Sequence, residues 1–155
     1  MIISFCDLLS WRRAIPREKR LVVTNGCFDV LHYGHIRYLQ EARNLGDLLL
    51  VGINSDLAVR SLKGQSRPVI NERMRALTLD ELKSVDYVCV FDSVNAAEFL
   101  DSARPNIYVK GGDYSKASLN KLELDVLATH NSEILISPLV EGLSTTSILD
   151  RISKP

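Results

Sequence analysis

The sequence predicts an α/β fold in which a doubly wound, parallel sheet of five strands has helices on both faces. Short apolar runs alternate five times with segments of helical periodicity, and the connections between them are short. No hairpin dipeptide separates two apolar runs, which disfavours antiparallel pairing. Residues 48–53 (LLLVGI) form a continuous apolar run, which is expected of a strand buried on both faces. These features are typical of a parallel sheet with helical crossovers.

The expected elements follow from this alternation in chain order. Ser4 is suited to cap a short helix whose Phe5, Leu8 and Leu9 share one face, so residues 1–20 are predicted to form a helical prefix. Strands are expected at residues 21–24, 48–53, 85–91, 107–109 and 134–136. Helices are expected at about residues 33–45, 56–62, 72–82, 94–102, 119–130 and 145–152.

Length and composition indicate one intracellular domain, which is expected to span residues 1–155. Hydrophobic residues make up 46% and charged residues 25%, which excludes disordered and fibrous classes. The 19 basic residues balance the 19 acidic ones, so neither nucleic acid nor an anionic membrane is an expected partner. The three cysteines match neither a disulfide framework nor a zinc-site spacing. No apolar run reaches membrane-spanning length, and a cytoplasmic protein is therefore expected.

Residues 24–46 carry the first candidate site. Asn25-Gly26 ends the first strand at a dipeptide that allows positive φ, and a helical pattern begins a few residues later. His32 and His35 therefore bracket a helix N-terminus, where unpaired N–H groups and a partial positive charge favour a phosphate. We predict that both imidazoles face the same anion. Packing or capping histidines are the alternative, and no metal site is expected because no third ligand stands at the required spacing.

Other polar segments are predicted to meet the histidines at one edge of the sheet. In a doubly wound sheet, ligands bind beyond the carboxyl ends of the strands, where the winding reverses. The glycine loops after the first and fourth strands and the Ser-Thr-Thr at residues 144–146 would face that edge. Neither a Gly-x-Gly-x-x-Gly nor a Gly-Lys-Ser/Thr loop is present, which disfavours dinucleotide oxidoreductases and Walker-type kinases. The histidines, the glycine loops and the Ser-Thr-Thr can all donate hydrogen bonds to phosphate oxygens. Such a set of donors suits the transfer of a nucleotidyl group.

Four segments, GCFDVLHYGH, RPV-x-x-x-R, KGGDY and EGLSTTSI, together resemble the His-x-Gly-His nucleotidyltransferases, and within them the adenylyltransferase unit of ADP-heptose synthase. The resemblance covers about residues 21–149. It implies a Rossmann-like fold of the nucleotidyltransferase type. It also implies that ATP and D-glycero-D-manno-heptose 1-phosphate give ADP-heptose and pyrophosphate, with Mg²⁺ and without a covalent enzyme intermediate. A homodimer is usual in the family.

The resemblance further implies roles for individual residues. The histidines and the backbone near Gly26 would contact the triphosphate, and Thr145 and Thr146 would hold the outgoing phosphates. Catalytic candidates are His32, His35, Lys63 and Arg73. Nucleotide-binding candidates are Gly26, Cys27, Phe28, Asp29, His32, His35, Gly112, Asp113, Ser144, Thr145 and Thr146.

Two other functions compete with this reading. One is a cytidylyltransferase that acts on glycerol 3-phosphate or another polyol phosphate, and the other is a nucleotide-binding module without turnover. Intact His32, His35 and Thr145 argue against the second. Structural roles also compete at single positions: the 63–68 loop as a solvated segment, Arg73 as half of a surface ion pair, and residues 144–146 as a helix cap.

Overall fold

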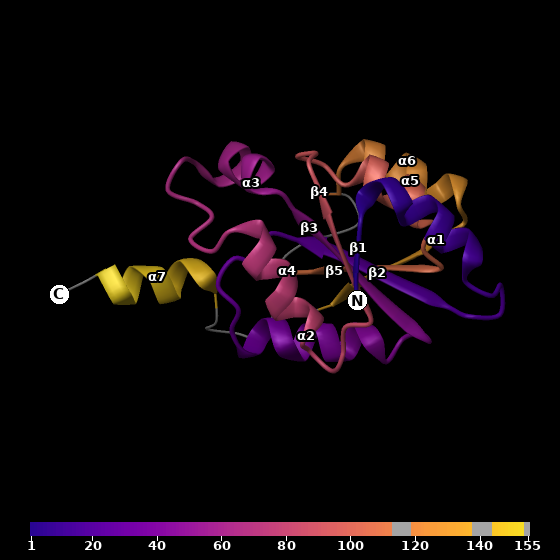
Figure 1. Ribbon diagram of the computed structural model, residues 1–155, viewed down its shortest axis with the longest axis horizontal. Helices are drawn as coiled ribbons and strands as arrows, with labels where there is room; N and C mark the ends of the chain where they lie inside the picture. The colour runs from indigo at the N-terminus through magenta and orange to yellow at the C-terminus, as the bar shows by residue number, and fades with distance from the viewer. Residues whose placement is uncertain (113–118, 138–143, 154–155) are drawn as a thin grey trace.

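The computed structural model describes residues 1–112, 119–137 and 144–153, so the candidate residue Asp113 lies outside the described residues. The described strands form one parallel sheet in the order β1-β4-β3-β2-β5-β6 (Figure 1). The strands are β1 (Ile2–Ile3), β2 (Leu21–Gly26), β3 (Leu48–Asn54), β4 (Tyr87–Phe91), β5 (Ile107–Gly111) and β6 (Glu133–Ser137). The helices are η1 (Phe5–Asp7, a 3-10 helix), α1 (Leu8–Ala14), α2 (Tyr33–Arg43), α3 (Asp56–Lys63), α4 (Glu72–Asp80), α5 (Ala97–Ala103), α6 (Lys121–Thr129) and α7 (Thr145–Ser153).

The N-terminal residues extend the sheet and do not form only a helical prefix. β1 pairs in parallel with β4, with Ile2 opposite Val88 and Ile3 opposite Cys89. The described sheet therefore has one strand more than the five that the sequence predicts. Two residues are too few to show a strand periodicity, and only their pairing with β4 makes them a strand. The expected helix follows as η1 and α1, although the Ser4 side chain makes no capping hydrogen bond.

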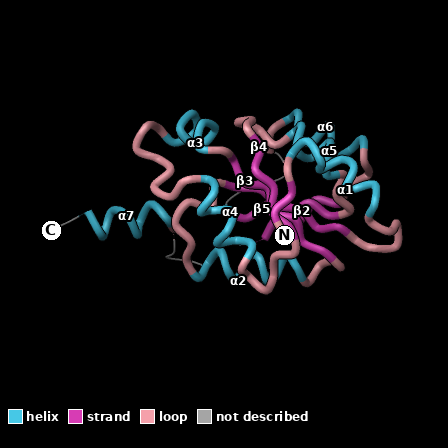
Figure 2. Tube along the Cα trace, in the orientation of Figure 1, coloured by secondary structure: helices cyan, strands magenta, loops and turns pink. Residues whose placement is uncertain are grey.

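Helices cover both faces of the sheet, which confirms the doubly wound arrangement (Figure 2). α2 and α4 pack on one face, whereas α1, α5 and α6 pack on the other. Each face has its own apolar core, because strands β2 to β5 bury side chains on both sides. The helical members of the first core are Leu39, Ala42, Ala76 and Leu79, and those of the second are Leu8, Phe99, Leu100, Ala103 and Leu127.

The winding reverses between β2 and β5, which lie side by side in the sheet. From β2 the chain returns to the sheet through α2, and from β5 it returns through α6 on the opposite face. The two strands therefore diverge at their carboxyl ends, Gly26 and Gly111. This is the place where doubly wound sheets bind ligands.

α7 projects away from the sheet (Figure 1). The hydroxyl of Thr145 donates to the carbonyl of Val30 at 3.1 Å and joins the first residue of α7 to the loop before α2. Across the described ranges, no helix is both long enough and apolar enough to cross a membrane.

Gly52 in β3 provides a test of the packing between sheet and helix. A Cβ atom there would lie 2.5 Å from the ring of Phe99, which is fully buried and stacks on Phe91. We expect Gly52→Ala to lower the free energy of unfolding by about 1–3 kcal/mol, the usual cost of overpacking a core. In urea denaturation, the double variant Gly52→Ala/Phe99→Leu should lose less free energy of unfolding than the sum of the losses of the two single variants. Purely additive losses would contradict the proposed clash.

Candidate active site

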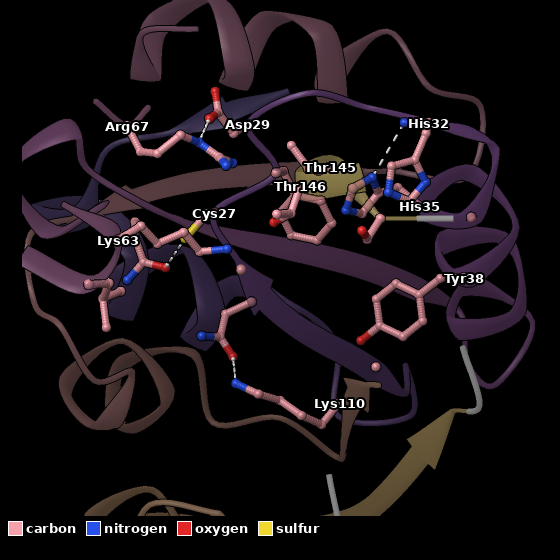
Figure 3. Close-up of a pocket in the computed structure, with 18 of the residues that line it drawn as sticks. Cys27, Asp29, His32, His35, Tyr38, Lys63, Arg67, Lys110, Thr145 and Thr146 are labelled. Atoms are coloured by element: carbon pink, nitrogen blue, oxygen red, sulfur yellow. Dashed lines mark hydrogen bonds and ion pairs between the residues drawn. The ribbon is translucent and has the colours of Figure 1, made fainter. Parts of the chain in front are cut away.

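A cavity of about 1000 Å³ opens at the carboxyl edge of the sheet, at the point where the winding reverses (Figure 3). Its volume is at the upper end of the range for small-molecule sites. Most sequence candidates line it, namely Gly26, Cys27, Phe28, Asp29, His32, His35, Lys63, Ser144, Thr145 and Thr146. Gly112 is not among the lining residues, although its neighbour Gly111 is. The tertiary structure thus brings together segments that are more than 100 residues apart.

The loop after β2 is shaped by a close approach between backbone and ring. Phe28 has a left-handed backbone with φ of 46°, which directs its ring into the core below the cavity. A Cβ atom on Gly26 would lie 3.1 Å from that ring, which explains why a glycine suits this position. The ring of Phe28 also packs against His35, with centroids 5.4 Å apart. Phe28 therefore supports the cavity wall from below.

The two histidines lie together at the start of α2. The backbone N–H of His32 donates to Nδ1 of His35 at 3.4 Å, and the ring centroids are 3.9 Å apart. Because Nδ1 of His35 is an acceptor, the proton of its neutral ring is on Nε2, which remains available as a donor. Nδ1 of His32 is buried and has no hydrogen-bond partner among the described residues. An unpaired buried nitrogen of this kind indicates a place for a ligand.

Both histidines are neutral near pH 7. Burial, together with the positive charges of His32 and Lys63, lowers the pKa of His35 from 6.5 to about 4. Burial also lowers the pKa of His32. The pair therefore offers hydrogen bonds to an anion without placing two charges side by side.

Asp29 organises the basic loop, although the sequence suggests a contact with the nucleotide. It is 3% exposed, and its carboxylate accepts hydrogen bonds from Arg67 Nε at 2.6 Å and from the N–H groups of Val69 and Ile70. Burial opposes ionisation of Asp29, but the two backbone N–H groups and Arg67 outweigh it and lower the pKa. Figure 3 shows this pair at the cavity wall, with Lys63 on a neighbouring side.

Arg75 is a buried residue that sequence reasoning missed. Its side chain is fully buried, and its guanidinium donates to the carbonyl of Ile70 at 2.9 Å, the carbonyl of Cys27 at 2.6 Å and the carboxylate of Asp56 at 2.7 Å. It therefore joins the β2 loop, the segment before α4 and the start of α3. The helical periodicity of the sequence could have indicated its burial, because Arg75 lies four residues before Leu79 and shares the buried face of α4 with it.

Arg73, by contrast, does not reach the cavity. Its side chain is exposed and lines a separate surface depression beside Asp92. Residues two apart on a helix point about 200° apart, so Arg73 and Arg75 cannot share one face. The structure therefore places the predicted catalytic charge of Arg73 outside the site.

The start of α7 forms another part of the cavity wall. Ser144 accepts the N–H of Ser147 at 3.0 Å and caps the helix, as the sequence predicts. Thr145 uses its hydroxyl to hold the carbonyl of Val30, and Thr146 is exposed. In Figure 3 both threonines lie close to the histidines. Thr146 and the N-terminus of α7 are therefore placed to meet the same anion as the histidines.

Cys27 lies in the cavity but lacks the features of a nucleophile. Burial raises the pKa of its thiol, even though Lys63, Arg75 and Arg67 act in the opposite direction. Its Sγ atom approaches Oδ1 of Asn54 at 3.9 Å. A thiol that is protonated at neutral pH is unreactive, so Cys27 is a small wall residue.

Comparison with known proteins supports the resemblance. The sequence model of a family described as cytidylyltransferase-like matches residues 23–151. The chain is 49% identical over 149 residues to bifunctional protein HldE from Syntrophotalea carbinolica, which covers 96% of this chain and 30% of that protein. It is 46% identical over 136 residues to bifunctional protein HldE from Pelobacter propionicus, which covers 88% of this chain and 28% of that protein. The chain thus spans less than a third of the length of these curated relatives.

Solved structures share the fold. A lipopolysaccharide core biosynthesis protein from Thermoplasma volcanium has a TM-score of 0.64 and 28% identity, covering 79% of this chain and 97% of that one. A pantoate-beta-alanine ligase from Francisella tularensis, complexed with beta-gamma ATP and beta-alanine, has a TM-score of 0.63 and 15% identity. The superposition covers 96% of this chain and 75% of that chain. At that identity the second likeness concerns the fold alone.

The two arginines of α4 allow a matched test of burial. Arg75→Ala leaves the carboxylate of Asp56 and two carbonyl groups without their donor, so we expect a loss of about 3–5 kcal/mol in the free energy of unfolding. Arg73→Ala changes an exposed side chain on the same helix and should cost about 0.5 kcal/mol or less. Urea denaturation of both variants measures the difference, and equal losses would refute the assigned role of Arg75.

The lowered pKa of His35 predicts how stability depends on pH. The His35 pKa is near 6.5 in the unfolded chain and about 4 in the folded protein, so between these two pH values the unfolded chain binds more protons. The neutral, buried His35 therefore contributes its full share of folding stability above pH 6.5, and this share is lost as the pH falls from 6.5 towards 4. We expect the wild type to lose more free energy of unfolding between pH 7 and pH 5 than His35→Gln does. Denaturant unfolding at both pH values tests this, and identical losses would mean that His35 titrates normally.

Proposed function

Because the chain belongs to the cytidylyltransferase-like family, we propose that it is a nucleotidyltransferase that transfers AMP from ATP to D-glycero-D-manno-heptose 1-phosphate, giving ADP-heptose and pyrophosphate. The sugar phosphate and ATP are proposed from the 43–49% identity to proteins named HldE. The observation that carries the proposal is the pair of neutral histidines at the start of α2, in a cavity that the threonines of α7 also line. Two uncharged donors and a helix N-terminus suit a triphosphate.

The reaction needs positioning more than covalent chemistry. An oxygen of the acceptor phosphate attacks the α-phosphorus of ATP, the bond from that phosphorus to the β-phosphate oxygen breaks, and pyrophosphate leaves. The Nε2–H of His35 is assigned to a phosphate oxygen whose negative charge grows in the transition state. The hydroxyl of Thr146 and the backbone N–H groups at the N-terminus of α7 are assigned to the leaving pyrophosphate, whereas the hydroxyl of Thr145 holds this end of the helix to the carbonyl of Val30.

Cations at the cavity wall complete the charge balance. Lys63, at the end of α3, lines the cavity and is exposed, so it can move onto a phosphate. Arg67 also lines the cavity. Asp29 holds its Nε atom, which leaves the other N–H groups of the guanidinium available for a ligand. We assign to Lys63 and Arg67 the neutralisation of negative charge on the reacting phosphates. The sequence suggests this role for Arg73.

Mg²⁺ is proposed to arrive with ATP. Within the described ranges, no group of three His, Cys, Asp or Glu residues could hold a metal ion. The carboxylate of Asp29, which lines the cavity, already accepts hydrogen bonds from Arg67 and two backbone N–H groups. Mg²⁺ retains water and binds readily to phosphate oxygens, so the triphosphate itself supplies its ligands. The bound ion would neutralise charge on the phosphates.

We further propose a cytoplasmic homodimer. Cys6, Cys27 and Cys89 are free thiols, which suits a reducing compartment. α7 projects from the body of the molecule and carries Ile152 with 75% of its surface exposed, which favours contact with a second copy.

A cytidylyltransferase is the second candidate, since the matching family is described as cytidylyltransferase-like. Pyrophosphate release with ATP and CTP, each against heptose 1-phosphate and glycerol 3-phosphate, separates the two. We expect turnover with ATP and heptose 1-phosphate. Turnover with CTP and glycerol 3-phosphate alone would establish the second candidate, and no turnover with any pair would refute both.

Removal of the His35 side chain tests the catalytic assignment. We expect His35→Ala to lower kcat by about 100- to 1000-fold, the loss typical for one donor that acts in the transition state. His130→Ala is the matched control, because His130 pairs with Asp101 beyond the end of α6 and does not line the cavity. Both variants should keep the wild-type circular dichroism spectrum. Near-normal turnover by His35→Ala would make His35 a packing residue.

A further inference from the structure

The outer face of α4 carries apolar side chains that are exposed. α4 lies on the same face of the sheet as α2, and Ala76 and Leu79 join it to the core there (Figure 1). On its other side, 54% of Met74 and 43% of Leu77 are exposed. Because residues three apart on a helix are neighbours, Met74 and Leu77 form one apolar pair. Adjoining apolar residues on a surface favour contact with another macromolecule.

Two charged residues flank this apolar pair. Arg73 lies four residues before Leu77, and Glu81 lies four residues after it, so the three side chains share one row of the helix surface. All three residues are exposed. Within the part of the chain that the structure describes, neither Arg73 nor Glu81 forms an ion pair. The row Arg73-Leu77-Glu81 is therefore basic, apolar and acidic in turn.

Both charges lie at the unfavourable ends of the helix. Arg73 is in the first turn of α4, where the helix dipole is positive, and Glu81 is the C-cap residue, where the dipole is negative. Each charge is therefore repelled by the end of the helix at which it lies. Such a departure from a local rule points to compensating charges outside the helix.

A second copy of α4 would provide these charges if it packed antiparallel, with a two-fold axis at Leu77. Arg73 and Glu81 are each about 6 Å from Leu77 along the helix axis, because the rise is about 1.5 Å per residue. Arg73 of one copy would therefore lie opposite Glu81 of the other, and this contact would occur twice. Leu77 would pack on its counterpart at the axis. A parallel pair would instead place like charges together, which is unfavourable.

We propose that the row Arg73-Leu77-Glu81, together with Met74, is a homodimer interface in which two copies of α4 pack antiparallel. The proposal rests on the homodimer of the proposed function and locates its contact on α4. The row is self-complementary, as the interface of a two-fold dimer requires. The proposal also gives a role to Arg73, which lies at a surface depression apart from the cavity.

Charge reversal tests this pairing. In sedimentation velocity over a dilution series, we expect Arg73→Glu and Glu81→Arg each to raise the dimer dissociation constant by about 10-fold or more, since each places like charges opposite one another twice. The double variant Arg73→Glu/Glu81→Arg restores opposite charges and should return to within about threefold of the wild type. Leu122→Glu is the matched control, because Leu122 is 57% exposed on α6, which packs on the other face of the sheet.

Cross-linking locates the two-fold axis independently of the affinity. Cys6 is exposed, so the cross-linking variants also carry Cys6→Ser. A short bifunctional maleimide should join two copies of Leu77→Cys at the axis, whereas Leu122→Cys should remain uncoupled. All variants should keep the wild-type circular dichroism spectrum.

The outcomes separate this inference from the proposals on which it rests. Unchanged dissociation constants for both single charge variants, or no recovery in the double variant, would overturn the antiparallel contact of α4. A dimer that only Ile152→Glu dissociates would place the contact on α7 and leave the proposed homodimer intact. A wild type that is monomeric at every concentration would refute the homodimer, and this inference with it. The proposed reaction is judged separately, by turnover.

Discussion

The architecture of the cavity depends on the buried guanidinium of Arg75. Its three donor directions meet the carbonyl of Cys27, the carbonyl of Ile70 and the carboxylate of Asp56, which come from segments far apart in the sequence. A planar group with several N–H donors suits this task better than an ammonium does. Since a buried cation is costly unless every donor is used, these three segments can pack only in the arrangement that satisfies it.

Asp29 adds a second ionic contact to the same region. Its carboxylate holds Arg67 and the backbone of Val69, so the basic loop is tied to the segment that carries the histidines. The cavity therefore combines two kinds of group. Neutral imidazoles lie where a triphosphate would be desolvated, and cations lie at the wall, where they can neutralise charge without lowering the stability of the core.

This division extends across the cavity. Hydrogen-bond donors gather near α2 and α7, whereas the α6 side presents the carboxyl group of Glu123 beside Lys110. The reversal of winding between β2 and β5 makes this possible, because it opens a cleft between helices of opposite faces.

The sequence alone determined the α/β class, the doubly wound sheet and the position of His32 and His35 at a helix start, because these follow from local periodicity and turn chemistry. The Ser144 cap was predictable for the same reason. The tertiary structure decided what depends on distant partners. β1 exists only through β4, and the phase of α4 buries Arg75 while exposing Arg73. Asp29 and Glu123 likewise take their roles from groups that lie far away in the sequence, on which local patterns carry no information.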